Sequence, residues 1–170
     1  MTIVVSDSGP FIHLATVNQF ALLQRYFQSV VTIHEVYDEV VTKGRGLPGS
    51  QELAAAREAG FVRLIDIERP QLVTELRQSA PAEVSDIDIK VLVLAIEQRL
   101  TLLSDDEPLR TLAKTQGKPV SGSIGLLIQA RRDGIIPALK PVLDQLIAAG
   151  FHLNPQGPVY RDALQSVSET

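Results

Sequence analysis

The sequence contains no cysteine and no tryptophan, and aromatic residues make up only 5% of its 170 positions. Without cysteine the chain has no disulfide, no thiolate metal site and no cysteine nucleophile. The scarcity of aromatic residues leaves few side chains on which the bases of a single-stranded nucleic acid could stack. The chain also lacks an apolar run of the roughly 18 residues that span a membrane, and no secretory signal pattern stands at its start. We therefore expect a cytoplasmic location and no association with a membrane.

Composition and charge narrow the classes of partner. Hydrophobic residues make up 45% of the chain and charged residues 21%, which is ordinary for a single globular domain of this length. The formal net charge is -4, and this argues against holding nucleic acid through bulk positive charge. A nucleic-acid site in this protein would need either a local basic patch or metal ions that neutralise local acids.

Segments typical of strands and helices alternate along most of the chain. We expect strands at residues 2–6, 30–33, 61–67, 100–103 and 119–123. Helical patterns lie between them, and the clearest one, from Ser85 to Arg99, has a broad apolar face. This alternation predicts an α/β fold, a three-layer α/β/α sandwich in which helices cover both faces of a central, mainly parallel sheet.

Carboxylates stand where the predicted strands end or where buried helices begin. These are the side chains of Asp7, Glu39, Asp86, Asp88, Asp105 and Asp106. Ligands of open α/β sheets bind beyond the carboxyl ends of the strands, so the alternating pattern would bring these regions to one edge. Carboxylates gathered there repel one another, and a hard divalent cation with oxygen ligands relieves the repulsion. Mg²⁺ or Mn²⁺ held in this way can activate a water and bind a phosphodiester.

Each acid also has a purely local interpretation. Asp7 could cap the helix that follows it. Ser85 and Asp88 have the spacing of a capping box, and the two acids after residues 100–103 precede a helix whose dipole favours negative charge. Glu39 could be an exposed helical side chain. The hypothesis of a metal site therefore rests on the joint pattern and on no single acid.

Five segments, in order, resemble PIN-domain proteins, and in particular a prokaryotic toxin branch of VapC-like ribonucleases. The first segment reads Val4-Val5-Ser6-Asp7-Ser8-Gly9-Pro10 and is followed by Phe11-Ile12-His13-Leu14. The other segments are residues 32–40, 85–92, 102–110 and 122–151. Together they cover residues 3–153. The resemblance implies a PIN-like domain of residues 1–153 followed by a C-terminal tail of residues 154–170.

The resemblance also implies an activity and partners. Proteins of this branch are Mg²⁺- or Mn²⁺-dependent endoribonucleases that hydrolyse RNA phosphodiesters, and they form the toxin of a toxin–antitoxin pair. A small antitoxin protein and a homodimer are implied with them. Two other hypotheses remain open: a non-catalytic PIN-like module that binds a protein, and a metal-dependent phosphohydrolase that acts on small phosphoesters.

The first three acids of the family's site can be placed on this chain by its motifs. Asp7 matches the first metal-binding acid. Glu39 matches the second, which holds the metal or orients the attacking water. Asp88 matches the third, and Asp86 is the alternative because this branch often has two acids two residues apart. The chain departs from the pattern at Lys90, where the branch often has an acidic or small residue.

The fourth acid and two hydroxyl positions complete the match. The Leu-Arg that follows fixes the fourth acid on Asp106, with Asp105 adjacent as a further candidate metal ligand. Ser8 and Ser123 match small hydroxyl residues near the site. His13 stands among apolar residues, so we expect it to have a packing or capping role. The three histidines do not have the spacing of a zinc site.

Overall fold

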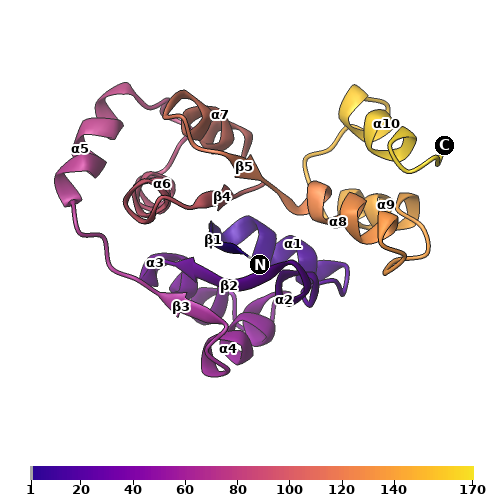
Figure 1. Cartoon of the computed structure of the whole chain (residues 1–170), viewed down its shortest axis with the longest axis horizontal. Coiled ribbons are helices and arrows are strands. Elements are labelled where there is room, and N and C mark those ends of the chain that lie inside the picture. Colours follow the sequence, from indigo (N-terminus) through magenta and orange to yellow (C-terminus); the bar gives the residue numbers. More distant parts are fainter. Residues whose placement is uncertain (1) are drawn as a thin grey trace.

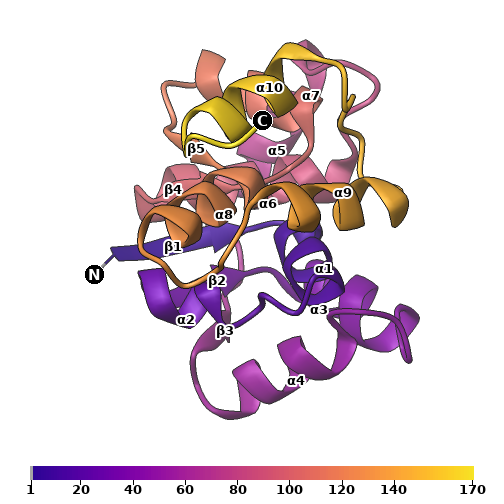
Figure 2. The same cartoon turned by 90° about the vertical axis from the view of Figure 1, so that its right-hand side faces the viewer.

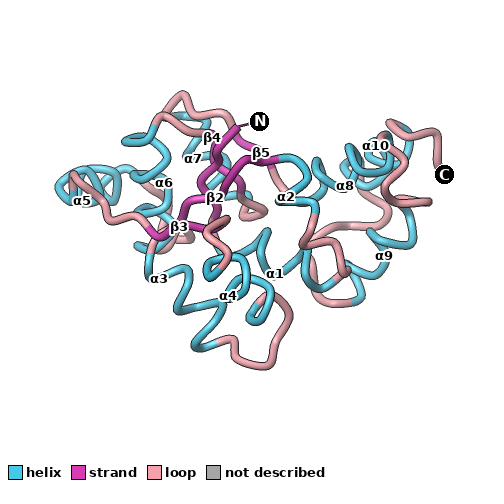
Figure 3. The backbone as a smooth tube through the Cα atoms, turned by 60° about the horizontal axis from the view of Figure 1, so that its bottom comes forward, coloured by secondary structure: helices cyan, strands magenta, loops and turns pink. Residues whose placement is uncertain are grey.

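The computed structural model describes residues 2–170 and contains one sheet of five strands in the order β3-β2-β1-β4-β5. The strands are β1 (Thr2–Ser6), β2 (Phe27–Thr32), β3 (Val62–Leu64), β4 (Thr101–Leu103) and β5 (Val120–Ser121). Every neighbouring pair is parallel. The predicted α/β fold with a central parallel sheet is therefore confirmed, and Figure 3 shows the strands lying together with helices around them.

Helices cover both faces of this sheet. They are α1 (Ser8–Thr16), α2 (Leu22–Tyr26), α3 (His34–Tyr37), α4 (Ser50–Glu58), α5 (Pro70–Ser79), α6 (Asp86–Gln98), α7 (Glu107–Thr115), α8 (Ser123–Arg132), α9 (Lys140–Ala148) and α10 (Pro158–Gln165). Helix α6 packs over β1 and β4, and α1 lies on the other side of β1 near α4 and α8 (Figure 1). In the described part of the chain, no helix has both the length and the apolar character that crossing a membrane requires.

The core forms from the apolar residues of the strands and of the middle of α6. Val5 of β1, Leu102 of β4 and Leu92 of α6 are fully buried. Residues 91–95 of α6 are buried without interruption, as expected for a helix that is covered on all sides. The helix predicted from Ser85 to Arg99 is present as α6: Ser85 caps its first turn, and Arg99 ends it in the left-handed conformation.

The order of the strands determines where a ligand site can form. β2 and β3 follow one another on one side of β1 in the sheet. The chain then crosses over, and β4 and β5 follow on the other side of β1. The segments that follow β1 and β4 therefore leave the sheet in opposite directions. Such a switch point leaves a crevice at the carboxyl ends of the two strands, and there the side chains of both segments can face one another.

The predicted helix after β2 is present but changes its winding. α3 is a single α-helical turn, and it continues as a π-helical segment, η1 (Asp38–Lys43), that contains Glu39. Gly44 ends this segment, and a Cβ on Gly44 would lie 2.4 Å from the carbonyl oxygen of Val40. Only glycine fits at this position, because the wide π turn brings the backbone close to itself.

The last residues have more structure than their sequence pattern indicated. Residues 158–165 form α10, and its side chains Tyr160, Ala163 and Leu164 are buried in the same apolar core as the rest of the chain. Glu169 accepts a hydrogen bond of 2.7 Å from Nε of Arg131 and also binds the backbone N–H of Leu139. Figure 2 shows α10 lying near α8 and α9.

Candidate active site

A cleft of about 240 Å³ opens at the switch point between β1 and β4, and we call it the acidic cleft. Its lining consists of Asp7, Ser8, Gly9, His13, Asp88, Asp105, Asp106, Gly150, Phe151 and His152. Four carboxylates thus reach it from three places: the end of β1, the start of α6 and the segment after β4. These are regions that the sequence predicted would meet at one edge of the sheet.

Asp7 lies deepest in the acidic cleft. It follows β1 directly and is the N-cap of α1, where its Oδ1 accepts a hydrogen bond of 3.2 Å from the backbone N–H of Gly9. Its Oδ2 accepts a hydrogen bond from the Ser104 hydroxyl, and the side chain is 4% exposed. The expected capping role is therefore present, and it is combined with a position at the floor of the cleft.

Asp105 is held from two sides. Its Oδ1 accepts a hydrogen bond of 2.6 Å from the backbone N–H of Ser123, and its Oδ2 accepts one of 2.5 Å from the Ser123 hydroxyl. Nδ1 of His13 lies 2.7 Å from the same Oδ2. Ser123 is fully buried and is absent from the cleft lining, so it supports the site through Asp105.

His13 has a larger part in the site than its sequence context suggested. Its ring packs edge-on against Phe151, with the centroids 4.6 Å apart and the planes at 86°. It also lines the acidic cleft beside Asp105. The available signal was its spacing: His13 follows Gly9 by four residues, so both lie on one face of α1, and that face turns toward Asp105.

Asp106 and Asp88 both cap helices while they line the cleft. Oδ2 of Asp106 accepts a hydrogen bond of 2.9 Å from the backbone N–H of Leu109, at the start of α7. Oδ2 of Asp88 accepts hydrogen bonds from the backbone N–H and the hydroxyl of Ser85, at 3.0 and 2.7 Å. Each of these two acids thus has the expected capping role and also lines the acidic cleft.

Two of the predicted acids lie elsewhere. The side chain of Asp86 is 76% exposed and pairs with Arg77 at 3.4 Å. Glu39 is exposed on η1 and does not belong to the lining of the acidic cleft. The acid of this region that approaches α6 is Glu35, whose Oε1 accepts a hydrogen bond of 2.6 Å from Nζ of Lys90.

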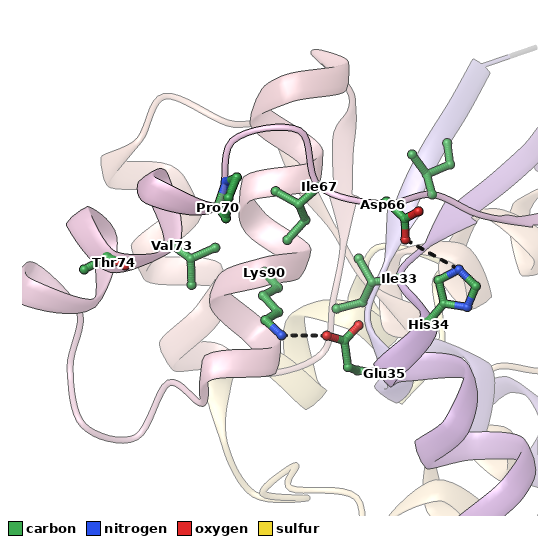
Figure 4. A pocket seen from close by; sticks show the side chains of 10 residues that line it. Ile33, His34, Glu35, Asp66, Ile67, Pro70, Val73, Thr74 and Lys90 are labelled. Atoms are coloured by element: carbon green, nitrogen blue, oxygen red, sulfur yellow. Dashed lines mark hydrogen bonds and ion pairs between the residues drawn. The ribbon is translucent and has the colours of Figure 1, made fainter.

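The pair formed by Glu35 and Lys90 lines a second pocket of about 350 Å³ beyond the ends of β2 and β3 (Figure 4). The hydrogen bond from Lys90 lowers the pKa of Glu35 below its usual value. In the same pocket, Nε2 of His34 lies 3.6 Å from Oδ1 of Asp66. A positive side chain thus occupies α6 two residues after Asp88, and it is paired with an acid of α3.

The comparison with known families assigns the fold. A family model for the PIN domain matches residues 3–169. The chain belongs to the PIN domain family. PIN domains are typically metal-dependent nucleases, and the family suggests that this protein binds nucleic acid. No curated protein matches the chain at a significant level.

The carboxylates of this PIN domain suit a hard divalent cation by their chemistry, because such ions prefer oxygen ligands. In the structure as it stands, however, each of the four carboxylates accepts internal hydrogen bonds. Among residues 2–170, no three histidine, aspartate or glutamate side chains are grouped closely enough to hold one ion. Coordination of one ion by all four acids would therefore require their side chains to move closer together.

Burial raises the pKa of Asp7 well above the usual value for aspartate, and the hydrogen bond from Ser104 opposes this shift. The nearby charges of Asp105, Asp88 and Asp106 raise the pKa further. A raised pKa means that the folded PIN domain binds a proton at Asp7 more tightly than the unfolded chain does. The ionised form of Asp7 therefore destabilises the fold at neutral pH.

We expect Asp7→Asn to raise the melting temperature at pH 7 in the absence of divalent metal. The amide removes a buried negative charge while keeping an oxygen for the N–H of Gly9. The gain should shrink as the pH falls toward the ordinary aspartate pKa, because the wild-type carboxyl is then protonated in both states. Thermal unfolding of both proteins from pH 4 to pH 8 tests this. A constant difference across that range would contradict it.

Proposed function

We propose that this PIN domain is an endoribonuclease that depends on Mg²⁺ or Mn²⁺. The observation that carries the proposal is the convergence of Asp7, Asp88, Asp105 and Asp106 on one cleft at the switch point of the sheet. A dense group of acids is a poor binder of phosphate on its own. It becomes suited to a phosphodiester when a divalent cation neutralises it.

In this proposal Asp7, Asp88 and Asp106 hold the metal, with Asp105 next to them. The bound ion would lower the pKa of a water and neutralise charge on the phosphate. Asp105 is already fixed by its hydrogen bonds with Ser123 and His13, so its side chain would keep its position when a metal binds. The backbone N–H of Gly9, at the start of α1, would keep its hydrogen bond to Asp7, because the Asp7 carboxylate caps that helix.

The proposed parts of Glu39 and Asp86 rest on resemblance alone. We assign Glu39 to holding the metal or orienting the attacking water because residues 32–40 resemble the family's second motif. Asp86 remains the alternative to Asp88 as a ligand. The exposed position of Glu39 and the pairing of Asp86 with Arg77 favour Asp7, Asp88 and Asp106 as the principal ligands.

The resemblance of five segments to the toxin branch supports a further part of the proposal. We assign the protein as the toxin of a toxin–antitoxin pair that forms a homodimer and binds a small antitoxin. Expression of the wild type without its partner should then arrest the growth of a bacterial host. Normal growth at a confirmed level of active protein would contradict the toxin assignment and leave the nuclease assignment standing.

One observation favours a second candidate, a non-catalytic PIN-like module that binds a protein. All four cleft carboxylates are engaged in internal hydrogen bonds, as they would be in a site that has only a structural role. This candidate predicts neither cleavage nor an effect of metal. The small-phosphoester hydrolase is a third hypothesis, and it predicts higher activity on p-nitrophenyl phosphate than on RNA.

Cleavage of a mixed RNA pool tests the proposal. The purified wild type should cut the pool in Mn²⁺, lose this activity in EDTA, and regain it when Mn²⁺ is restored. p-Nitrophenyl phosphate serves as the comparison substrate under the same conditions. An absence of cleavage in Mn²⁺ and in Mg²⁺ would overturn the nuclease assignment in favour of the binding module.

A further inference from the structure

A mainly apolar groove of about 670 Å³ adjoins the acidic cleft, and we call it the apolar groove. It lies between β5, the first turn of α8 and the segment that leads from α9 into α10. Its apolar lining comes from Val120, Ile124, Phe151, Leu153, Pro158 and Val159. The groove and the acidic cleft share Asp105, Phe151 and His152, so the two hollows lie side by side.

We propose that the apolar groove receives one unstacked base of the RNA, next to the phosphate that lies at the carboxylates. This inference rests on the proposed function, because it concerns the substrate of the same site. Single-stranded RNA is recognised by bases that are splayed out of the stack and packed against apolar or aromatic side chains. A volume of about 670 Å³ also lies within the usual range of small-molecule pockets, about 300–1,000 Å³.

The charges around the groove favour a base over a phosphate. Among the described residues that line it, Arg110 is the only arginine or lysine. Nη1 of Arg110 donates hydrogen bonds to the carbonyl oxygens of Ser104 and Ser121, at 2.7 and 2.9 Å. Its Nε lies 3.5 Å from Glu107, which also lines the groove. The guanidinium of Arg110 is already hydrogen-bonded, and the acids Asp105 and Glu107 also line the groove. The groove therefore suits an uncharged group with apolar faces.

Phe151 and His152 line both hollows, so in this proposal they lie between the base in the apolar groove and the RNA phosphate at the carboxylates. Phe151 lines both hollows, and its ring is fixed edge-on against His13. His152 is exposed at the same junction and offers ring nitrogens to the edge of a base. In a chain with few aromatic residues, this placement puts two planar side chains beside the four carboxylates.

The groove can be filled without touching the acidic cleft. Gly125 lines the groove, and a Cβ built on it meets only the hydroxyl of Ser121, at 3.7 Å. The variant Gly125→Leu should fold, because leucine is a better helix former than glycine and the position is open. Gln129→Leu is the matched control, since Gln129 is exposed one turn further along α8 and lies outside the groove lining.

The experiment combines these variants with an abasic scan. An oligonucleotide that the wild type cuts at one bond is prepared with a single abasic site at each position around that bond. For the wild type, one abasic position next to the cut should lower kcat/KM about tenfold, within the range measured for base stacking. Gly125→Leu should cut the intact oligonucleotide about tenfold more slowly and lose its sensitivity to that position. Gln129→Leu should behave as the wild type does.

The outcomes separate this inference from the proposed function. If the wild type cuts RNA but the abasic scan is flat, or if Gly125→Leu keeps the wild-type sensitivity, the base subsite is overturned while the nuclease stands. A flat scan together with loss of binding to a protein partner in Gly125→Leu would assign the groove to that protein instead. If the wild type cuts no RNA at all, the proposed function fails and the inference fails with it.

Discussion

Replacing Asp7 by asparagine is expected to lower RNA cleavage about a thousandfold while the protein stays folded. Asp7 is the buried carboxylate at the floor of the acidic cleft, and three other acids of the cleft act on its charge. Loss of a metal-holding carboxylate removes about 4 kcal/mol of transition-state stabilisation, which corresponds to about a thousandfold in rate. Cleavage of a defined RNA at saturating Mn²⁺ measures this effect, and circular dichroism checks the fold.

Asp86→Asn is the comparison for this prediction, because it makes the same chemical change at the less favoured of the two candidate ligands in α6. Asp86 is exposed and its pair with Arg77 is at the surface, where such pairs contribute little. We expect its cleavage rate to stay within about twofold of the wild type, the range of a neutral surface change. A loss in Asp86→Asn as large as that in Asp7→Asn would contradict this prediction and make Asp86 a metal ligand.

The second large effect is expected at Gly122. Its backbone is extended, with φ of -158°, so its conformation does not require glycine. The constraint is space: a Cβ would lie 2.8 Å from Asp105 Oδ1, 2.8 Å from Arg110 Nη1 and 2.9 Å from the carbonyl oxygen of Ser104. These atoms are all held by hydrogen bonds. Gly122→Ala should therefore destabilise the fold by about 1–3 kcal/mol, as overpacking does.

Gly125→Ala provides the comparison for Gly122→Ala. It makes the same substitution three residues later, where the added Cβ has room. We expect it to leave stability unchanged or to raise it by up to about 1 kcal/mol through helix propensity. Urea unfolding of the two variants measures the difference. If Gly122→Ala were as stable as Gly125→Ala, the close packing around Asp105 would not be a constraint on the site.

The sequence was sufficient to predict the sheet and the meeting of several acids at one of its edges, because both follow from the order of strands and helices. Buried strands have apolar and β-branched residues, and their carboxyl ends must meet at one edge of a parallel sheet. Asp7 and the acids after β4 directly follow such strands. Their meeting in the acidic cleft could therefore be predicted from residue order alone.

Directions of side chains could not be predicted in the same way. A continuous helical pattern after β2 revealed neither the π-helical segment that contains the exposed Glu39 nor the contact of Glu35 with Lys90. The contact of His13 with Asp105 joins residues that are 92 positions apart, so the spacing of His13 from Gly9 could show the face of α1 on which it lies but not its partner. α10 was missed as a packed element because its eight residues give only a short apolar stripe, and packing against distant residues makes it stable.

The most direct test of a metal centre in the acidic cleft is the thermal stability of the wild type and Asp7→Asn as Mn²⁺ is added. It requires no knowledge of the RNA that is cut. At a concentration one hundred times the Kd, a bound ion stabilises the fold by about 2.7 kcal/mol, so the wild-type Tm should rise by about 5 °C or more. Asp7→Asn should show little or no rise. A flat wild-type Tm up to millimolar Mn²⁺, or equal rises in both proteins, would contradict the account.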